Sequence, residues 1–245
     1  MNNKKSWIKL LPGNNHLINI LGSIDEKIEN LTIINEKLIN YSNQLFSQSF
    51  SNKNDNVVKL GLVVSQSNTG ADAIQKAPIV DYNTGIRCAR VGDFSNHRPI
   101  SNWGYCKINE HDYKQYKLKQ DDILITRTAT LGLNKFIDED CDAVYNNGLI
   151  RIKIDKTKAL PRFIYKLINT KDYYDYIAGI EGGSSTRPNM KINFLLDYKF
   201  NLPTLEQQRE YDEKYKILRK IEIDNNKKIE KLNHLKQLYL KKVFG

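Results

Sequence analysis

The stretch LINILGSIDEKIENLTIINEKLINYSNQLF, residues 17–46, carries an apolar side chain at every seventh position. Two further apolar residues lie four positions after the first two members of the series, which completes the seven-and-four spacing of a coiled-coil seam. The stretch therefore predicts a long helix whose apolar side packs against another helix. The seam residues expected on it are Leu17, Leu21, Ile24, Ile28, Leu31, Leu38 and Leu45.

A second stretch, REYDEKYKILRKIEIDNNKKIEKLNHLKQLYLKKVF at residues 209–244, has the same pattern. An offset of 194 residues carries the first series onto it and also carries Phe50 onto Phe244. A Leu-Pro pair precedes each stretch, at 11–12 and 202–203. We interpret this as an internal repeat, although any two amphipathic helices can be aligned by choosing an offset. The interface residues expected here are Tyr211, Tyr215, Leu218, Asn225, Ile229, Leu232 and Tyr239.

The two stretches are expected to pair antiparallel within one chain, because the chain leaves through one helix and returns through the other. Asn35 and Asn225 lie on or beside the apolar seam. A buried asparagine at such a position fixes the register of the two helices at some cost in stability.

The middle of the chain has a different pattern. Short β-branched runs bounded by Gly, Asn and Asp predict strands within 57–66, 85–94, 121–132 and 142–154, and YNNG at 145–148 predicts a turn. PRFIYKLINTKDYYDYIAG, residues 161–179, predicts one helix with proline in its first turn. The expected fold is α+β: a mixed domain with a curved sheet, flanked by two long helices that form an antiparallel coiled coil. The expected division is 1–56, 57–201 and 202–245.

The composition favours a nucleic-acid partner. The net charge of +10 is distributed as +1 over residues 1–56, +5 over 57–201 and +4 over 202–245, and such an excess favours a polyanion. An AT-rich genome, which inflates Lys and Asn, is the alternative explanation. The three cysteines show no metal-ligand spacing and fit a reduced cytosolic setting. No apolar run approaches the ~20 residues that span a bilayer, and no signal-peptide core is present, so we expect a cytoplasmic protein without a membrane partner.

Five motifs resemble one protein family. DDILITRTATLG at 121–132, GIRCARVGDF at 85–94 and NNGLIRI at 146–152 are similar to strands of the target recognition domains in specificity subunits of Type I restriction-modification systems. GGSSTRPNMKINFLLDYKFNLPTLEQQRE at 182–210 resembles the loop, short helix and Leu-Pro-x-x-Glu-Gln entry to the family's helical spacer. LPGNNHLINILGSIDEKIENL at 11–31 resembles the first copy of that spacer.

The resemblance implies a non-catalytic DNA-binding subunit of a host-defence system that needs no cofactor. Its middle domain would read one half-site of a bipartite target in double-stranded DNA, and its helices would dock the methyltransferase and restriction subunits. The family's full-length chain alternates two recognition domains with two spacers, whereas this chain has one recognition domain. It resembles a half subunit, which implies a homodimer or pairing with another half subunit.

The candidate DNA-binding residues lie mainly in predicted loops. The Gly182-Gly183 pair allows close approach of the backbone to DNA, hydroxyl groups donate to phosphates or base edges, and Arg187 can pair bidentately with guanine. For Arg127, a salt bridge to Asp121 or Asp122 is the alternative. For the residues of the 182–187 loop, an ordinary surface loop with an exposed arginine remains the alternative. The candidates are Arg90, Asn96, Arg98, Arg127, Thr128, Ser184, Ser185, Thr186, Arg187, Asn189 and Lys191.

No catalytic motif is present in the sequence. Glycine-rich phosphate loops, Gly-x-Ser-x-Gly, His-Glu-x-x-His and an Asn-Pro-Pro-Tyr-like sequence are all absent. Two other classes stay open: a coiled-coil adaptor that binds protein, and a stand-alone DNA-cleaving enzyme whose metal-binding carboxylates converge only in the fold.

Overall fold

The chain forms two compact units in the computed structural model, which describes residues 15–50, 56–181 and 189–244. The first unit contains most of α1 (Asn15–Ser49) and of α7 (Leu205–Phe244). The second unit comprises residues 49–212.

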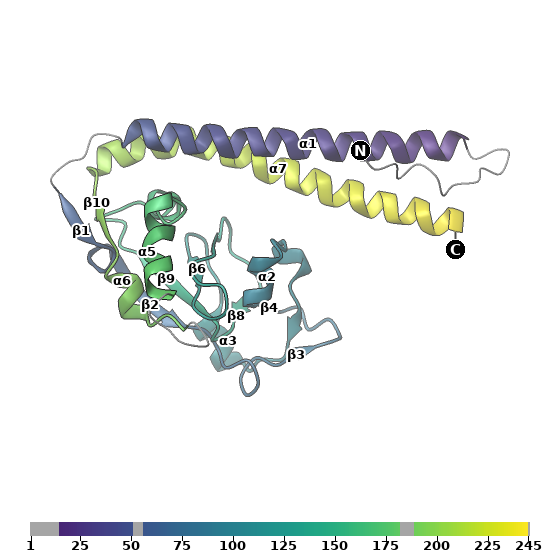
Figure 1. Cartoon of the computed structure of the whole chain (residues 1–245). Coiled ribbons are helices and arrows are strands. Elements are labelled where there is room, and N and C mark those ends of the chain that lie inside the picture. The colour runs from purple at the N-terminus through teal and green to yellow at the C-terminus, as the bar shows by residue number, and fades with distance from the viewer. Residues whose placement is uncertain (1–14, 51–55, 182–188, 245) are drawn as a thin grey trace. The chain divides into compact units, whose positions relative to one another are not determined.

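In the first unit, α1 and α7 run side by side in opposite directions (Figure 1). Near one end of the pair, Asp25 Oδ1 accepts a hydrogen bond from Lys236 Nζ at 2.5 Å. Further along α1, Asn35 bonds to Asn225 and Asn226 at 2.9 Å each. Residue numbers rise along one helix as they fall along the other. The predicted antiparallel coiled coil is therefore confirmed.

The expected seam residues all lie on the covered side of the two helices. Ile24, Tyr215 and Asn225 are buried, and Tyr211, which falls in the second unit, is also buried, with its ring 5.4 Å from that of Phe50. None of the remaining seam residues is exposed. Those half-buried members are Leu17, Leu21, Ile28, Leu31, Leu38, Leu45, Leu218, Ile229, Leu232 and Tyr239.

The second unit is a mixed α+β domain, as expected, and its described strands divide among three sheets. The first sheet is antiparallel with the order β2-β9-β6-β7, and the second has the order β3-β5-β4-β8, with β4 and β8 parallel. β1 and β10 form a separate antiparallel pair. The strands are β1 (Val57–Lys59), β2 (Val64–Thr69), β3 (Ile79–Val80), β4 (Arg87–Ala89), β5 (Tyr105–Cys106), β6 (Ile123–Thr126), β7 (Asn134–Phe136), β8 (Ala143–Tyr145), β9 (Leu149–Ile154) and β10 (Lys199–Asn201).

Short helices connect these strands. The α-helices are α2 (Val91–Ser95), α3 (Glu110–Tyr116), α4 (Pro161–Leu167), α5 (Lys171–Glu181) and α6 (Ile192–Leu196), and the 3-10 helices are η1 (Leu60–Leu62) and η2 (Ile100–Asn102). The expectation of one helix over 161–179 is wrong, because the chain turns between α4 and α5. There the Thr170 hydroxyl donates to the Leu167 carbonyl at 2.7 Å, and the Asn169 amide donates to the Tyr165 carbonyl at 2.6 Å. Such side-chain bonds compete with helix continuation.

Two predicted strands are shorter than their sequence patterns. The run at 57–66 is interrupted by η1, where Leu60 is fully buried and its backbone N–H donates to the Tyr198 carbonyl at 2.7 Å. The run at 85–94 ends as a strand at Ala89, and its remainder forms α2. The first change follows from a tertiary contact that a period of two cannot reveal. The second follows from a local cap, because the Asp93 carboxylate accepts from the Arg90 N–H at 2.9 Å at the start of α2.

β6 lies inside the first sheet and forms part of the core. Its residues Ile123, Leu124 and Ile125 have no exposed surface. Asp122, just before the strand, is 1% exposed and lies 3.0 Å from Lys153 Nζ and 3.8 Å from the Arg151 guanidinium. A buried carboxylate needs such partners, because an unpaired charge would be strongly destabilising there.

The start of α7 is fixed by three side chains of the second unit. Thr204 and Gln207 form a reciprocal cap: the Gln207 N–H donates to Thr204 Oγ1, and the Thr204 N–H donates to Gln207 Oε1 at 3.0 Å. Gln208 is fully buried and bridges the Leu160 N–H and the Pro203 carbonyl at 2.8 and 2.9 Å. Gln208, directly after the Leu-Pro-x-x-Glu-Gln segment, therefore ties the first turn of α7 to the rest of the second unit.

Candidate DNA interface

Four strands of the second unit end at one edge. β2 and β6 flank β9 and run opposite to it, so both end where β9 begins, with Thr69 opposite Ile150 and Thr126 opposite Leu149. β8 leads into β9 through a tight turn, and β4 lies parallel to β8, so these two strands end there as well. The segments that follow them are therefore neighbours. We call this set the loop edge: Gly70–Ala77, Arg90–Val91, Arg127–Leu131, Asn146–Gly148 and Asn189–Met190.

Backbone hydrogen bonds hold the first of these segments against the 146–148 turn. The Ala71 N–H donates to the Tyr145 carbonyl at 2.9 Å, and the Asn147 N–H donates to the Ala71 carbonyl at 2.8 Å. Gly70 is required here, because a Cβ would lie 2.2 Å from the Tyr145 carbonyl oxygen. Any larger residue at position 70 would force the backbone after β2 away from the 146–148 turn. The predicted turn at 145–148 is confirmed.

Arg127 joins three segments of the loop edge. Its backbone pairs with Gly148 at 2.9 Å and with Met190 at 2.8 Å. Its guanidinium donates to the carbonyls of Met190 and Asn147 at 3.2 Å each. The next residue, Thr128, forms an antiparallel bridge with Asn189. Arg127 thus fixes the backbone immediately after residues 182–188.

The alternative of a salt bridge from Arg127 to Asp121 or Asp122 is wrong. Asp121 accepts from Lys156 at 2.6 Å, and Asp122 is paired with Lys153 and Arg151. These two aspartates lie at the start of β6, whereas Arg127 follows its end.

Gly148 lies close to the side chains of Val91 and Thr128. A Cβ on Gly148 would lie 2.9 Å from Val91 Cγ2 and 3.1 Å from Thr128 Oγ1. Beside Thr128, Ala129 has a φ of +61°, a left-handed conformation that a residue with a Cβ adopts only at a cost. Such strain concentrates at functional loops. The sequence carried no signal for it, since no glycine occupies the position.

Arg90, Asn96 and Arg98 flank α2. Arg90 is exposed and follows Ala89, whose carbonyl accepts from the Asn146 N–H at 3.1 Å, so it lies at the loop edge. Asn96 and Arg98 lie at the other end of α2 and are also exposed. The buried Asp93 carboxylate links the two ends, accepting from the Arg90 N–H at 2.9 Å and from the Arg98 guanidinium at 3.3 Å.

The structure thus brings only some of the predicted DNA-binding residues together. Arg90, Arg127, Thr128 and Asn189 meet at the loop edge, and the exposed Lys191 lies two residues beyond Asn189. The remaining predicted residues, Ser184, Ser185, Thr186 and Arg187, lie outside the described residues.

Sequence reasoning missed a polar group on this edge, formed by Asp72 and Asn147. Asp72 Oδ1 accepts from the backbone N–H groups of Gln75 and Ile74 at 2.7 and 2.9 Å, and Oδ2 accepts from the Asn147 amide at 3.4 Å. The N–H donors of Gln75 and then Ile74 lower the pKa of Asp72. The sequence signal for this group was weak: an Asp can cap the backbone N–H groups of the residues two and three positions after it.

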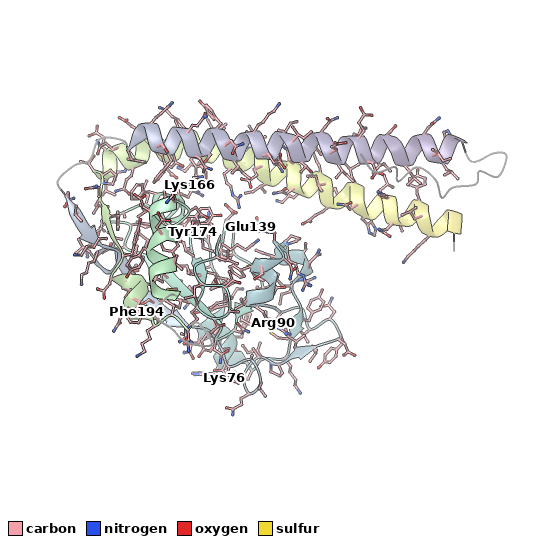
Figure 2. The ribbon with its side chains drawn as sticks, in the orientation of Figure 1. Lys76, Arg90, Glu139, Lys166, Tyr174 and Phe194 are labelled. Carbon is pink, nitrogen blue, oxygen red and sulfur yellow. The ribbon has the colours of Figure 1, made fainter. Side chains whose placement is uncertain are left out.

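Figure 2 places Lys76, in the first segment of the loop edge, and Glu139 at opposite ends of this domain. Glu139 follows β7, whose Phe136 pairs with Ile123 at the start of β6. The loop edge itself combines exposed guanidinium, amide and hydroxyl groups with backbone held close to the surface. These are the groups that bind DNA phosphates and base edges.

Other kinds of site find little support in the part of the chain that the structure describes. No group of three or more His, Cys, Asp or Glu side chains there has the arrangement of a metal site. Of the helices in residues 15–50, 56–181 and 189–244, none has an apolar stretch long enough to cross a membrane.

The family comparison gives the class of this domain, a DNA-specificity domain. The family model of the Type I restriction modification DNA specificity domain matches residues 56–234, and the chain belongs to this family. The match covers the mixed domain and much of α7. No curated protein sequence matches the chain.

Two solved structures share the fold. The Type I restriction-modification S subunit from M. genitalium superposes with a TM-score of 0.65 at 16% sequence identity, over 93% of this chain and 59% of that one. The HsdS subunit from Thermoanaerobacter tengcongensis gives a TM-score of 0.50 at 13% identity, over 94% of this chain and 56% of that one. The chain thus spans less than two thirds of each of these subunits.

Proposed function

We propose that this chain is a non-catalytic, sequence-specific DNA-recognition subunit that reads one half-site of a bipartite target. Residues 57–201 are the recognition domain, and residues 1–56 and 202–245 are the spacer helices. The subunit works in the cytoplasm, needs no cofactor, and completes its target by pairing with a second copy or another half subunit. The observation that carries the proposal is the convergence of five segments at the loop edge of a domain from a DNA-specificity family.

The loop edge supports this proposal because its backbone is held by hydrogen bonds and its exposed side chains are polar. Arg127 fixes three of its segments through main-chain and guanidinium bonds. Arg90, Asn147 and Asn189 are exposed beside them. A rigid framework that presents polar side chains reads base edges with little loss of backbone entropy.

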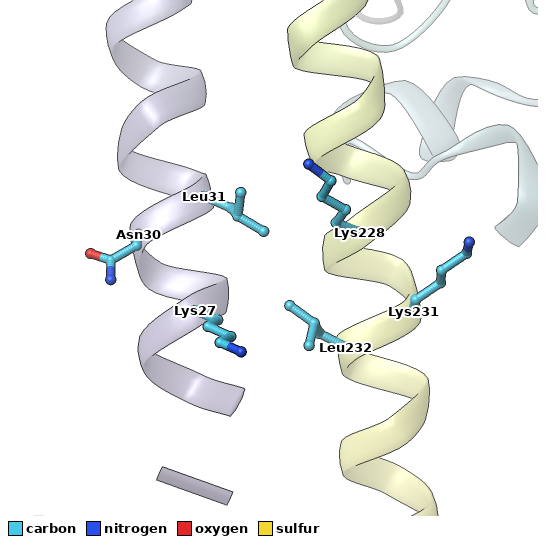
Figure 3. A pocket seen from close by; sticks show the side chains of 6 residues that line it. All are labelled: Lys27, Asn30, Leu31, Lys228, Lys231 and Leu232. Atoms are coloured by element: carbon cyan, nitrogen blue, oxygen red, sulfur yellow. The ribbon is translucent and has the colours of Figure 1, made fainter. Parts of the chain in front are cut away.

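A groove in the coiled coil supports docking of the methyltransferase subunit. It has a volume of about 420 Å³ and lies between α1 and α7 (Figure 3). Leu31 and Leu232 both point into it, and its lining is completed by Lys27, Asn30, Lys228 and Lys231. An apolar floor with a lysine rim is complementary to an acidic amphipathic helix. We propose that such a helix of the methyltransferase subunit binds here.

A charge-reversal variant tests the docking. Lys228→Glu with Lys231→Glu should weaken co-purification with the cognate methyltransferase subunit at least ~10-fold, because rim charges steer and stabilise the encounter. The control is Lys37→Glu with Lys220→Glu, two exposed lysines of the same helices outside the groove. Equal binding by both variants would contradict the docking site.

Binding to duplex DNA across a salt series tests the recognition function. With the methyltransferase subunit present, the chain should bind its preferred duplex at least ~10³-fold more tightly than a scrambled one, and both affinities should fall steeply from about 50 to 200 mM salt. A protein-binding adaptor would show neither effect. A DNA-cleaving enzyme would cut with divalent metal and no partner.

A further inference from the structure

One apolar side chain stands out at the polar loop edge. Ile74 is 83% exposed, more than any other large apolar residue identified as exposed in the described residues. A single exposed apolar residue on a protein surface is ordinary. What distinguishes Ile74 is its position in the Gly70–Ala77 segment and the rigidity of its turn.

The turn that carries Ile74 is fastened on both sides. Asp72 caps the N–H groups of Ile74 and Gln75, and its own carbonyl accepts from the Ala77 N–H at 2.9 Å. On the far side, Lys76 Nζ lies 2.9 Å from the Asp112 carboxylate. On the near side, Ala71 is bonded to the 146–148 turn. The backbone that carries the Ile74 side chain is therefore already ordered, so binding a partner costs it little conformational entropy.

The chemistry of Ile74 suits one feature of DNA. The major groove presents donors, acceptors and a single kind of apolar group, the C5-methyl of thymine. A β-branched side chain is stiff about χ1 and loses little rotamer freedom on contact. It can cover that methyl group while the neighbouring polar side chains bind donors and acceptors.

We propose that Ile74 is a specificity-determining residue that contacts a thymine methyl group in the target half-site. The proposal rests on the proposed function, since it needs a recognised DNA sequence. It adds an apolar reading contact to the polar ones and predicts a thymine within the half-site at the position facing the Gly70–Ala77 segment.

A double-mutant cycle tests the contact: it removes the thymine methyl group, the Ile74 side chain, or both. The full chain with the methyltransferase subunit is bound to its selected duplex, and each thymine of the half-site is replaced by deoxyuridine. For the native chain, one replacement should weaken binding about fourfold, the effect of losing one buried methyl group. Ile74→Ala should bind the thymine duplex more weakly and show no further loss on that same replacement.

Leu62→Ala is the matched control. Leu62 is 52% exposed and precedes β2, whereas Ile74 follows the end of that strand. This variant should retain the native fourfold response to deoxyuridine. Since both side chains are exposed, neither variant should lose folding.

The outcomes separate this contact from the recognition function itself. If the native chain selects a sequence but no deoxyuridine replacement weakens it, the thymine contact is overturned and the recognition function stands. The same holds if Ile74→Ala responds to every replacement as the native chain does. If no sequence is selected at all, the proposed function fails and the contact fails with it.

Discussion

The side-chain amide of Asn225 donates to Oδ1 of Asn35 at 2.9 Å, in the middle of the coiled coil. Both residues are buried, with 6% and 8% of their surfaces exposed, and the Asn35 amide donates in turn to Oδ1 of Asn226 at 2.9 Å. The pair sets the register of α1 against α7, because any sliding of one helix would leave buried amides without partners.

Replacement of one asparagine of this pair by leucine should therefore be destabilising. Asn35→Leu leaves the Asn225 amide buried without its acceptor, which should lower the free energy of unfolding by about 1–3 kcal/mol. The double variant Asn35→Leu with Asn225→Leu should recover most of that loss. Urea unfolding of the single and double variants measures the coupling. Additive effects would show that the two amides do not act as a pair.

Disruption of the leucine seam should unfold the coiled coil of α1 and α7. Leu31→Asp with Leu218→Asp places carboxylates on the covered side of both helices and should lower stability by at least about 2 kcal/mol. Circular dichroism should show lost helicity and a lower melting temperature. The matched control is Ile33→Asp with Ile217→Asp, since these side chains are 41% and 64% exposed on the same helices. Unchanged helicity and melting in the seam variant would refute the account.

The coiled coil could be predicted from sequence because its signal is local and periodic. The spacing of Leu17, Ile24 and Leu31 specifies a helix face, and two such faces in one chain specify a pair. The loop edge could not be predicted in this way. Arg127 and Met190 are 63 residues apart and meet only in the folded domain, beside the bridge between Thr128 and Asn189.

Removal of the Arg127 side chain should destabilise the second unit as well as weaken DNA binding. Its guanidinium satisfies the carbonyls of Met190 and Asn147, and each such bond contributes about 0.5–1.5 kcal/mol. Arg127→Ala should therefore cost ~1–3 kcal/mol in urea unfolding. Arg209→Ala, at an exposed arginine on α7, is the control. A stability loss no larger than that of the control would contradict this structural role. Arg127 would then act only in DNA binding.

Arg187 and Lys191 should differ in what they contribute to DNA binding. A guanidinium can match the two acceptors of guanine, whereas an ammonium acts as a point charge on phosphate. Arg187→Ala should cost ~1–3 kcal/mol on the preferred duplex and relax specificity at one position. Lys191→Ala should weaken matched and scrambled duplexes alike and reduce the salt slope by about one. An equal loss on both duplexes for Arg187→Ala would make Arg187 a phosphate contact.

The pairing of two recognition domains is tested most directly by selection of bound sequences from a random duplex library, with the methyltransferase subunit present. Under the proposed function, residues 57–201 read one half-site, and a second recognition domain reads the other. The selected target should therefore consist of two half-sites separated by an unread spacer of fixed length, and it should be palindromic if the second copy is identical. Selection of a single contiguous site by a strict monomer, or no enrichment of any sequence, would contradict this account.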